Sequence, residues 1–171
     1  RVIVSGSIGD HGMTVMSLRE DMTFGTDLKS DCAPLGKMVE RLLAAAPGAH
    51  VLRDPTRGGL GTTLNEIAAE SGVGITLHEA QIPVKDEVRA ACEFLGLDPL
   101  YSACEGRLIA IVPEAEADAA LSAIRSDPHG TGAAIIGEVT AENPGFVEMV
   151  TLMGGRRMVD WLTGEQLPRI C

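Results

Sequence analysis

The sequence predicts an α+β fold, a layered sandwich in which a mixed, mostly antiparallel sheet is flanked by helices. Two patterns predict it. Helical and strand segments alternate over most of the chain, whereas the last part offers strands in succession. Of 171 residues, 45% are hydrophobic and only 3% aromatic, so one core would consist of Ala, Val, Ile, Leu and Met. We expect one domain over 1–162 and a mobile tail over 163–171.

The first half of the chain predicts six segments. We expect a strand over 1–9 that ends in a glycine turn, and Asp10 as the cap of a helix over 11–21. The helix over 33–48 is amphipathic, with Pro34 in its first turn and an apolar face of Leu35, Met38, Val39, Leu42 and Leu43. The remaining segments are a strand over 50–54, a helix over 60–72 and a strand over 73–79.

The second half predicts two more helices, over 84–96 and 114–126, and four strands. The apolar run at 107–112 does not alternate, which is typical of a strand buried on both faces. Strands over 132–140 and 145–155 are joined by the turn residues of 141–145, so we expect them to pair locally. A short strand is expected over 156–162.

Charge and composition exclude several classes of protein. The net charge is −10 and no basic cluster exceeds Arg156–Arg157, which argues against nucleic-acid binding. No apolar run approaches the ~20 residues of a membrane span. The chain begins at Arg1 without a methionine or a signal peptide, and we expect a fragment of a longer protein.

The four cysteines form no CxxC pair, which argues against a zinc site. We interpret the protein as cytoplasmic with reduced thiols. Cys92 lies on an expected helix and is interpreted as a small buried hydrophobe. Cys104 has no histidine near it in sequence, and we prefer a structural thiol there.

The stretch RDPTRGGLGTTLNE at 53–66 carries the strongest internal signal for chemistry. A strand ends near Asp54, and a turn with adjacent glycines then enters a helix, which suits an anion-binding site. The residues proposed to face a phosphate or its Mg²⁺ are Asp54, Thr56, Arg57, Gly58 and Gly59. The alternative is an ordinary strand–turn–helix corner with Asp54 as a cap.

Two other positions suggest function less specifically. Asp10 and His11 follow a glycine-rich turn, although a helix cap and a surface histidine explain them equally well. Glu105 lies in a turn of small residues before a buried strand, where a desolvated carboxylate can act as a general base. The alternative for Glu105 is an ordinary loop glutamate.

The chain ends on Cys171, preceded by Pro168 and Arg169. The nearby arginine favours the thiolate and the terminal carboxylate opposes it. Prenylation requires a cysteine four residues from the end, so this is not such a signal. Chemistry alone leaves a carrier thiol and an incidental cysteine as equal alternatives.

Eight motifs in order resemble the HypE family, the carbamoyl dehydratases of [NiFe]-hydrogenase maturation. They are GDHG, SDCAPL, RDPTRGGLGTTLNEIA, IPV, LGLDPLY, EGRLIAIV, IIGEV and the terminal PRIC. The PRIC ending separates that family from selenophosphate synthetase, thiamine-monophosphate kinase and aminoimidazole ribonucleotide synthetase. The resemblance runs from Val2 to Cys171 and covers only the C-terminal half of such a protein; the half that forms much of the ATP site and the dimer core is absent.

The resemblance implies a function for the tail. Cys171 would be a carrier that HypF loads with a carbamoyl group, and ATP with Mg²⁺ would drive dehydration of the S-carboxamide to an S-thiocyanate. The nitrile would pass to iron on the HypC–HypD scaffold, and the full-length protein would be a homodimer. The family implies Glu105 as the base, the 54–59 turn beside the nucleotide, and Asp10 and His11 as active-site wall.

Two further expectations follow. The fragment by itself would be inactive, and Cys104 stands where the family commonly has an asparagine, which bears on the hydrogen bonds of Glu105. The alternatives are another ATP-dependent phosphoryl-transfer enzyme of the same superfamily and a non-enzymatic binding module. A requirement for the terminal cysteine would separate the first of these from a dehydratase.

Overall fold

The computed structural model describes residues 1–19 and 28–162. Within them, one seven-stranded sheet has the order β2-β4-β1-β5-β3-β6-β7. The strands are β1 Val2–Val4, β2 Val51–Arg53, β3 Gly74–His78, β4 Ile109–Ile111, β5 Ala134–Thr140, β6 Val147–Val150 and β7 Arg156–Met158. The α-helices are α1 Asp10–Arg19, α2 Gly36–Ala45, α3 Gly59–Ser71, α4 Asp86–Leu95 and α5 Ala117–Arg125, with 3₁₀ turns η1 Glu79–Gln81, η2 Pro99–Tyr101 and η3 Glu114–Glu116.

The sheet is mixed and mostly antiparallel, which confirms the predicted fold class. Among the described strands, only the pair β3–β6 is parallel. The interior strand β1 lies antiparallel to β4 and β5, with Ile3 opposite Ala110 and Ile135. All three residues of β4 are buried, as its continuous apolar run predicted.

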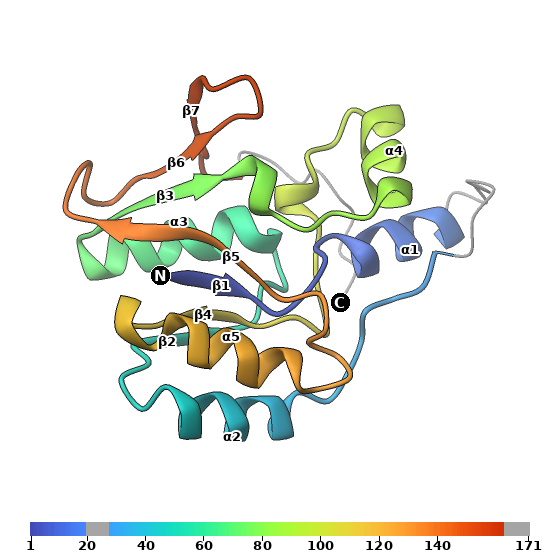
Figure 1. Ribbon diagram of the computed structural model, residues 1–171. Helices are drawn as coiled ribbons and strands as arrows, with labels where there is room; N and C mark the ends of the chain where they lie inside the picture. Colours follow the sequence, from blue (N-terminus) through green and yellow to red (C-terminus); the bar gives the residue numbers. More distant parts are fainter. Residues whose placement is uncertain (20–27, 163–171) are drawn as a thin grey trace.

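Helices cover both faces of the sheet, and Figure 1 shows α2 beside α5 with α3 on the opposite face. The strand β1 supplies both cores because its side chains alternate. Ile3 packs with α2 and α5, whereas Val2 and Val4 pack with α3. The helices α1 and α4 pack on each other in a third apolar cluster that includes the buried Cys92, as predicted for that thiol.

The predicted local pairing of the strands over 132–140 and 145–155 is wrong. Both strands exist, but β3 lies between them, antiparallel to β5 and parallel to β6. The connection crosses the beginning of β3, where Gly145 N–H donates to Val73 O (2.9 Å) and Ile75 N–H donates to Phe146 O (3.0 Å). The turn residues therefore carry the chain over β3 instead of closing a hairpin.

The last described residues bind the sheet edge to α3. Val159 is buried, and its N–H donates to Val147 O (2.8 Å). Asn65 Nδ2 on α3 donates to Val159 O (2.8 Å), and Tyr101 Oη donates to Asp160 O (2.7 Å). The predicted tail over 163–171, with Cys171, lies outside the described residues.

Candidate functional site

The loop 102–106 joins two segments that the sequence marked separately. It lies between the turn before α1 and the turn before α3, at the end of the sheet where β1 and β2 finish. Three hydrogen bonds fix it there: Cys104 N–H to Pro55 O (3.0 Å), Gly12 N–H to Ala103 O (3.0 Å) and Ser102 Oγ to Gly9 O (3.3 Å). The structure thus brings the 5–12, 54–59 and 102–106 segments together.

Glu105 is half-buried in this loop. Its Oε1 is shielded from solvent and has no hydrogen-bond partner among the described residues. Its backbone N–H donates to Asp31 Oδ1 (2.9 Å). A buried carboxylate oxygen without a donor is costly in a folded protein and is a common feature of functional sites.

Cys104 has the environment of a structural thiol. The side chain is fully buried, Gly9 N–H donates to its Sγ (3.3 Å), and burial raises its pKa to about 12. A thiol that stays protonated is a poor nucleophile. The sulfur accepts its hydrogen bond from the first glycine turn. It does not act on Glu105, whose backbone is bound by Asp31 instead.

A charge network with two buried carboxylates lies beside the loop, and the sequence did not predict it. Arg107 Nη2 lies 3.2 Å from Asp10 Oδ2, and Arg107 Nε lies 3.7 Å from Asp31 Oδ2. Lys85 Nζ lies 2.9 Å from the same oxygen of Asp10. Burial raises the pKa of Asp31, whereas the Glu105 N–H and Arg107 lower it.

Asp10 is not the cap that the sequence predicted. It is the first residue of α1, is almost fully buried, and accepts a hydrogen bond from Ser7 Oγ (2.7 Å) besides its contacts with Arg107 and Lys85. Its Oδ1 has no partner among the described residues. His11 Nδ1 lies 2.9 Å from Ser30 Oγ, and this contact ties α1 to the 28–32 segment.

A cavity of about 480 Å³ opens onto this network. Asp10, Asp31 and Arg107 line it together with Lys85 and His129. Sequence reasoning assigned no role to Asp31, Lys85 or Arg107. Asp31 and Arg107 lie within the motifs SDCAPL and EGRLIAIV. Sequence spacing, however, cannot show that these two residues meet in the fold.

The glycines of the 54–59 turn have a clear structural purpose. Gly58 and Gly59 both have positive φ, 71° and 60°. A Cβ on Gly59 would lie 2.6 Å from Leu100 O and Ser102 O, so the turn packs directly on the Glu105 loop. Asp54 is not a helix cap, because Gly58 occupies that position.

Polar side chains of the same turn remain available for a ligand. Asp54 and Arg57 are exposed, and no hydrogen bond or ion pair with the described residues occupies either of them. Thr56 contributes its carbonyl oxygen to Gly59 N–H (3.2 Å). An acidic and a basic side chain therefore flank a glycine turn at a helix N-terminus, an arrangement that suits a phosphate with its cation.

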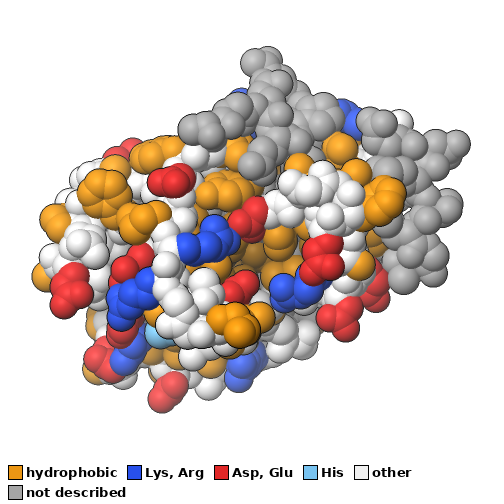
Figure 2. Space-filling model, turned by 90° about the horizontal axis from the view of Figure 1, so that it is seen from above, with side chains coloured by type: hydrophobic (Ala, Val, Ile, Leu, Met, Phe, Trp, Pro, Cys, Tyr) orange, Lys and Arg blue, Asp and Glu red, His pale blue; other side chains and the backbone are white. Residues whose placement is uncertain are grey.

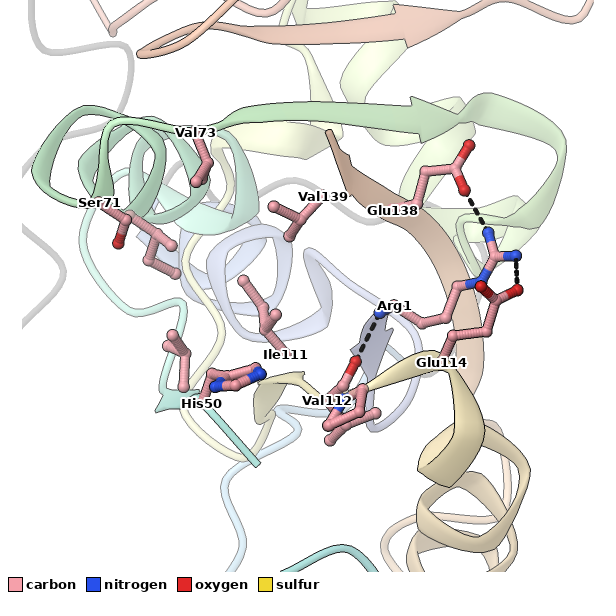
Figure 3. Close-up of a pocket in the computed structure, with 12 residues that line it drawn as sticks. Arg1, His50, Ser71, Val73, Ile111, Val112, Glu114, Glu138 and Val139 are labelled. Atoms are coloured by element: carbon pink, nitrogen blue, oxygen red, sulfur yellow. Dashed lines mark hydrogen bonds and ion pairs between the residues drawn. The ribbon is translucent and has the colours of Figure 1, made fainter. Parts of the chain in front are cut away.

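Two further cavities open elsewhere on the surface. One of about 420 Å³ lies at the opposite end of β1, where Arg1 forms ion pairs with Glu114 and Glu138 (Figure 3). Figure 2 shows a hollow with an apolar floor and charged rim on the face that carries β6 and β7. On that side, a cavity of about 260 Å³ is flanked by the Asp98–Arg157 ion pair (2.8 Å).

The described residues show neither a metal-binding cluster nor a membrane-spanning helix. Within residues 1–19 and 28–162, no three His, Cys, Asp or Glu side chains are grouped so as to hold a metal ion. The described helices include none with the length and apolar character needed to cross a membrane.

Comparison with known proteins gives matches over the whole chain. The model of the AIR synthase related protein C-terminal domain matches residues 1–150. The chain is 60% identical over 171 residues to the carbamoyl dehydratase HypE of Azotobacter vinelandii, and this match covers 100% of the chain and 50% of that protein. The chain thus spans about half the length of the curated relatives it matches.

Solved structures of relatives share the fold closely. A crystal structure of the hydrogenase maturation protein HypE in complex with ATP superposes with a TM-score of 0.94 at 49% identity, over 99% of this chain and 52% of that one. The HypE chain in a HypE–HypF complex gives a TM-score of 0.90 at 45% identity, over 94% and 52% of the two chains.

Proposed function

The chain belongs to the AIR synthase related family, and from this premise we propose that it forms the carrier- and base-bearing part of an ATP-dependent carbamoyl dehydratase for [NiFe]-hydrogenase maturation. Its similarity to proteins named carbamoyl dehydratase HypE, at up to 60% identity, supports the proposal. The activity would belong to the full-length protein, because the chain spans only half of those relatives.

The proposed reaction converts a carbamoyl group on the Cys171 sulfur into a nitrile. The amide oxygen attacks the γ-phosphorus of ATP, and ADP leaves. A base then removes a nitrogen-bound proton as the C–O bond to phosphate breaks, and loss of the second N–H proton completes the C≡N bond. The overall change is S–CO–NH₂ plus ATP to S–C≡N plus ADP and phosphate.

The environment of the Glu105 carboxylate is the observation that carries this proposal. Its buried Oε1 lacks a donor among the described residues, and the carboxamide N–H of a carbamoylated Cys171 is a donor of the required kind. The nine residues of 163–171 span at most about 30 Å when extended. This length gives the terminal thiol a wide reach from Leu162.

We propose that ATP binds at the neighbouring turn, and that a relative has been crystallised with ATP supports ATP as the nucleotide. Arg57 would pair with a phosphate, and the Gly58 and Gly59 backbone would allow close approach at the start of α3. Magnesium usually binds one or two carboxylates plus substrate phosphates, and exposed Asp54 fits that pattern. The bound ion would neutralise charge on the transferred phosphoryl group.

The proposed partners follow from the carrier chemistry. HypF would load the thiol, in keeping with the HypE–HypF complex formed by the relative. A HypC–HypD scaffold would receive the nitrile, and the full-length protein would be a homodimer. The carrier thiol has to remain reduced, so the cytosol is the proposed compartment.

Intact-mass and C-terminal peptide mass spectrometry test the proposal directly. Full-length protein incubated with its carbamoyltransferase and carbamoyl phosphate should gain about 43 Da on Cys171, falling to a gain of about 25 Da when ATP is turned over. Cys171→Ser should gain neither mass, whereas Cys32→Ser, which removes an exposed thiol, should behave as wild type. An unmodified Cys171, with the carbamoyltransferase active on a control, would refute the carrier role.

A further inference from the structure

The position of Glu105 is set by its backbone rather than by its side chain. Its Oε1 has no partner among the described residues, so no side-chain hydrogen bond to that oxygen restrains it. The Glu105 and Gly106 N–H groups, in contrast, both donate to one acceptor, Asp31 Oδ1, at 2.9 and 3.2 Å. Whatever fixes Asp31 therefore also fixes the backbone that carries the Glu105 side chain.

Gly106 shows how closely the two segments approach. A Cβ at this position would lie 1.7 Å from Asp31 O and 2.8 Å from Ala33 N. Such distances are far inside van der Waals contact, so only glycine permits the approach. The 105–106 peptide thus rests directly on the 31–33 backbone.

Asp31 itself is buried beside a positive charge. Its side chain is 0% exposed, and its Oδ2, which has no hydrogen-bond partner among the described residues, lies 3.7 Å from Arg107 Nε. Arg107 also contacts Asp10 and donates to Ser7 O (2.7 Å), so its own position is fixed. A buried carboxylate needs such a partner to remain charged. A charged acceptor also makes shorter and stronger hydrogen bonds to N–H groups than a neutral one does.

We propose that Asp31 is the positioning residue for Glu105, holding the general base of the dehydration step through two backbone N–H groups. This inference rests on the proposed function. It goes further because it assigns a positioning role to a residue that lies outside the 54–59 turn and does not touch the reacting atoms. Because Asp31 acts through the loop, its loss should slow proton removal and leave loading of Cys171 intact.

The test is a single-turnover measurement on full-length protein whose Cys171 already carries the carbamoyl group. After addition of ATP, mass spectrometry follows conversion of the carbamoyl to the nitrile adduct. Asp31→Ala should reduce this rate about 10- to 100-fold, since a displacement of about 1 Å at a reacting group has effects of that size. The loading rate and the apparent KM for ATP should stay within about twofold of wild type.

Glu148 offers a control away from the site. Its side chain is 14% exposed, its Oε1 accepts a hydrogen bond from Thr76 Oγ1 (3.0 Å), and it pairs with Arg156. Glu148→Ala removes a largely buried carboxylate with an arginine partner from β6, which does not contact the Glu105 loop. We expect its dehydration rate to stay within about threefold of wild type even where the thermal midpoint falls.

A second variant keeps the proposal falsifiable if Asp31→Ala does not fold. Asp31→Asn retains a carbonyl acceptor but loses the charge, so we expect a three- to tenfold slower rate and an upfield shift of the Gly106 amide proton. A wild-type rate in Asp31→Asn despite that shift, or in a folded Asp31→Ala, would overturn the inference. If Glu105→Gln also retained full activity, the proposed function itself would fail.

Discussion

Cys104 and Glu105 are adjacent in sequence but lie in opposite environments. The thiol points into the core, where it accepts the Gly9 N–H, and it is 0% exposed. The carboxylate stays half-buried at the edge of the same loop, with its N–H on Asp31. Of these two successive positions, one therefore serves packing and the next is available for chemistry.

The first prediction concerns the proposed base. Glu105→Gln keeps the shape of the side chain but removes its ability to accept a proton, so carbamoylated Cys171 should accumulate without conversion, at least about 100-fold slower than wild type. Mass spectrometry of the C-terminal peptide separates the two adducts. Glu93→Gln, which changes a helix glutamate of α4, is the control. Normal conversion in Glu105→Gln would exclude this residue as the base.

The second prediction concerns the buried thiols and alkaline pH. Burial raises the pKa of Cys92 from 9.0 to about 11 and that of Cys104 to about 12. Below pH 9 both thiols are protonated in the folded and unfolded chains, so their stabilising contribution is fully present. Between pH 9 and the folded values the unfolded chain loses these protons first, and the free energy of unfolding falls by about 1 kcal/mol per thiol at pH 10.

Urea unfolding at pH 7 and pH 10 measures this decline. Cys92→Ala and Cys104→Ala should each show a smaller loss between the two pH values than wild type. Cys32→Ser should show the wild-type loss, since Cys32 is exposed. An identical loss in all three variants would show that other groups cause the alkaline decline.

At the residue scale, the sequence predicts roles for local features and misses remote ones. The sequence itself shows that Glu105 precedes a buried strand and that two glycines are adjacent at 58–59. The partnership of Asp31 with Arg107 is not, because 76 positions separate two residues that only the fold brings together. For Asp10 the sequence leaves a helix cap and an active-site role open, because the same residue type serves helix starts and buried ion pairs equally well.

At the scale of elements, the α3 start and the Glu105 loop behave as one unit. Gly59 meets the carbonyl oxygens of Leu100 and Ser102 at a distance that leaves no room for a side chain. The helix α3 also carries Asn65, whose side chain donates a hydrogen bond to Val159 O just after β7. A shift of α3 would therefore move the loop on one side and the exit of the tail on the other.

The third prediction compares Gly59, the first residue of α3, with Gly72, which follows its last residue. Gly59 and Gly72 have nearly equal φ values, 60° and 63°, but a Cβ on Gly72 would meet nothing within 4 Å. Gly72→Ala should therefore cost only the backbone strain of about 1 kcal/mol. Gly59→Ala should cost at least about 2 kcal/mol more, because the carbonyls of the loop must move.

Calorimetric thermal midpoints of the two variants give this comparison, and the dehydration rate adds a second readout. Gly72→Ala should retain the wild-type rate, whereas Gly59→Ala should lose activity together with stability. Equal midpoints for the two variants would mean that the loop adapts without cost. The φ-matched pair removes backbone strain as an explanation for any difference.

The elements themselves were largely predictable, since periodicity reports which face of a segment is buried. The seven strands and five α-helices of the described residues all fall within or next to predicted segments. Pairing was less accessible. The sequence separates β3 from β6 by nearly 70 residues, and its turn signal at 141–145 is the same whether the chain closes a hairpin or crosses β3.

At the scale of the whole molecule, the sheet divides packing from chemistry. The α2–α5 face is an apolar layer around Ile3, Met38, Leu42 and Ile124. The proposed site instead lies at the end of the sheet, where three loops meet. Function at strand ends and stability within the layers is a common division in layered folds, because loops tolerate polar groups that the core does not.

The last prediction uses the point where the tail leaves this body. Ending the full-length chain after Leu162 removes Cys171 but keeps the contacts of Val159 and Asp160, so the thermal midpoint should change by no more than about 1 °C while loading is abolished. Ending it after Met158 also removes a buried valine and the acceptors of Asn65 and Tyr101. That cut should cost about 2–4 kcal/mol, measured by calorimetry. Equal midpoints after both cuts would show that residues 159–162 do not bind the sheet edge to α3.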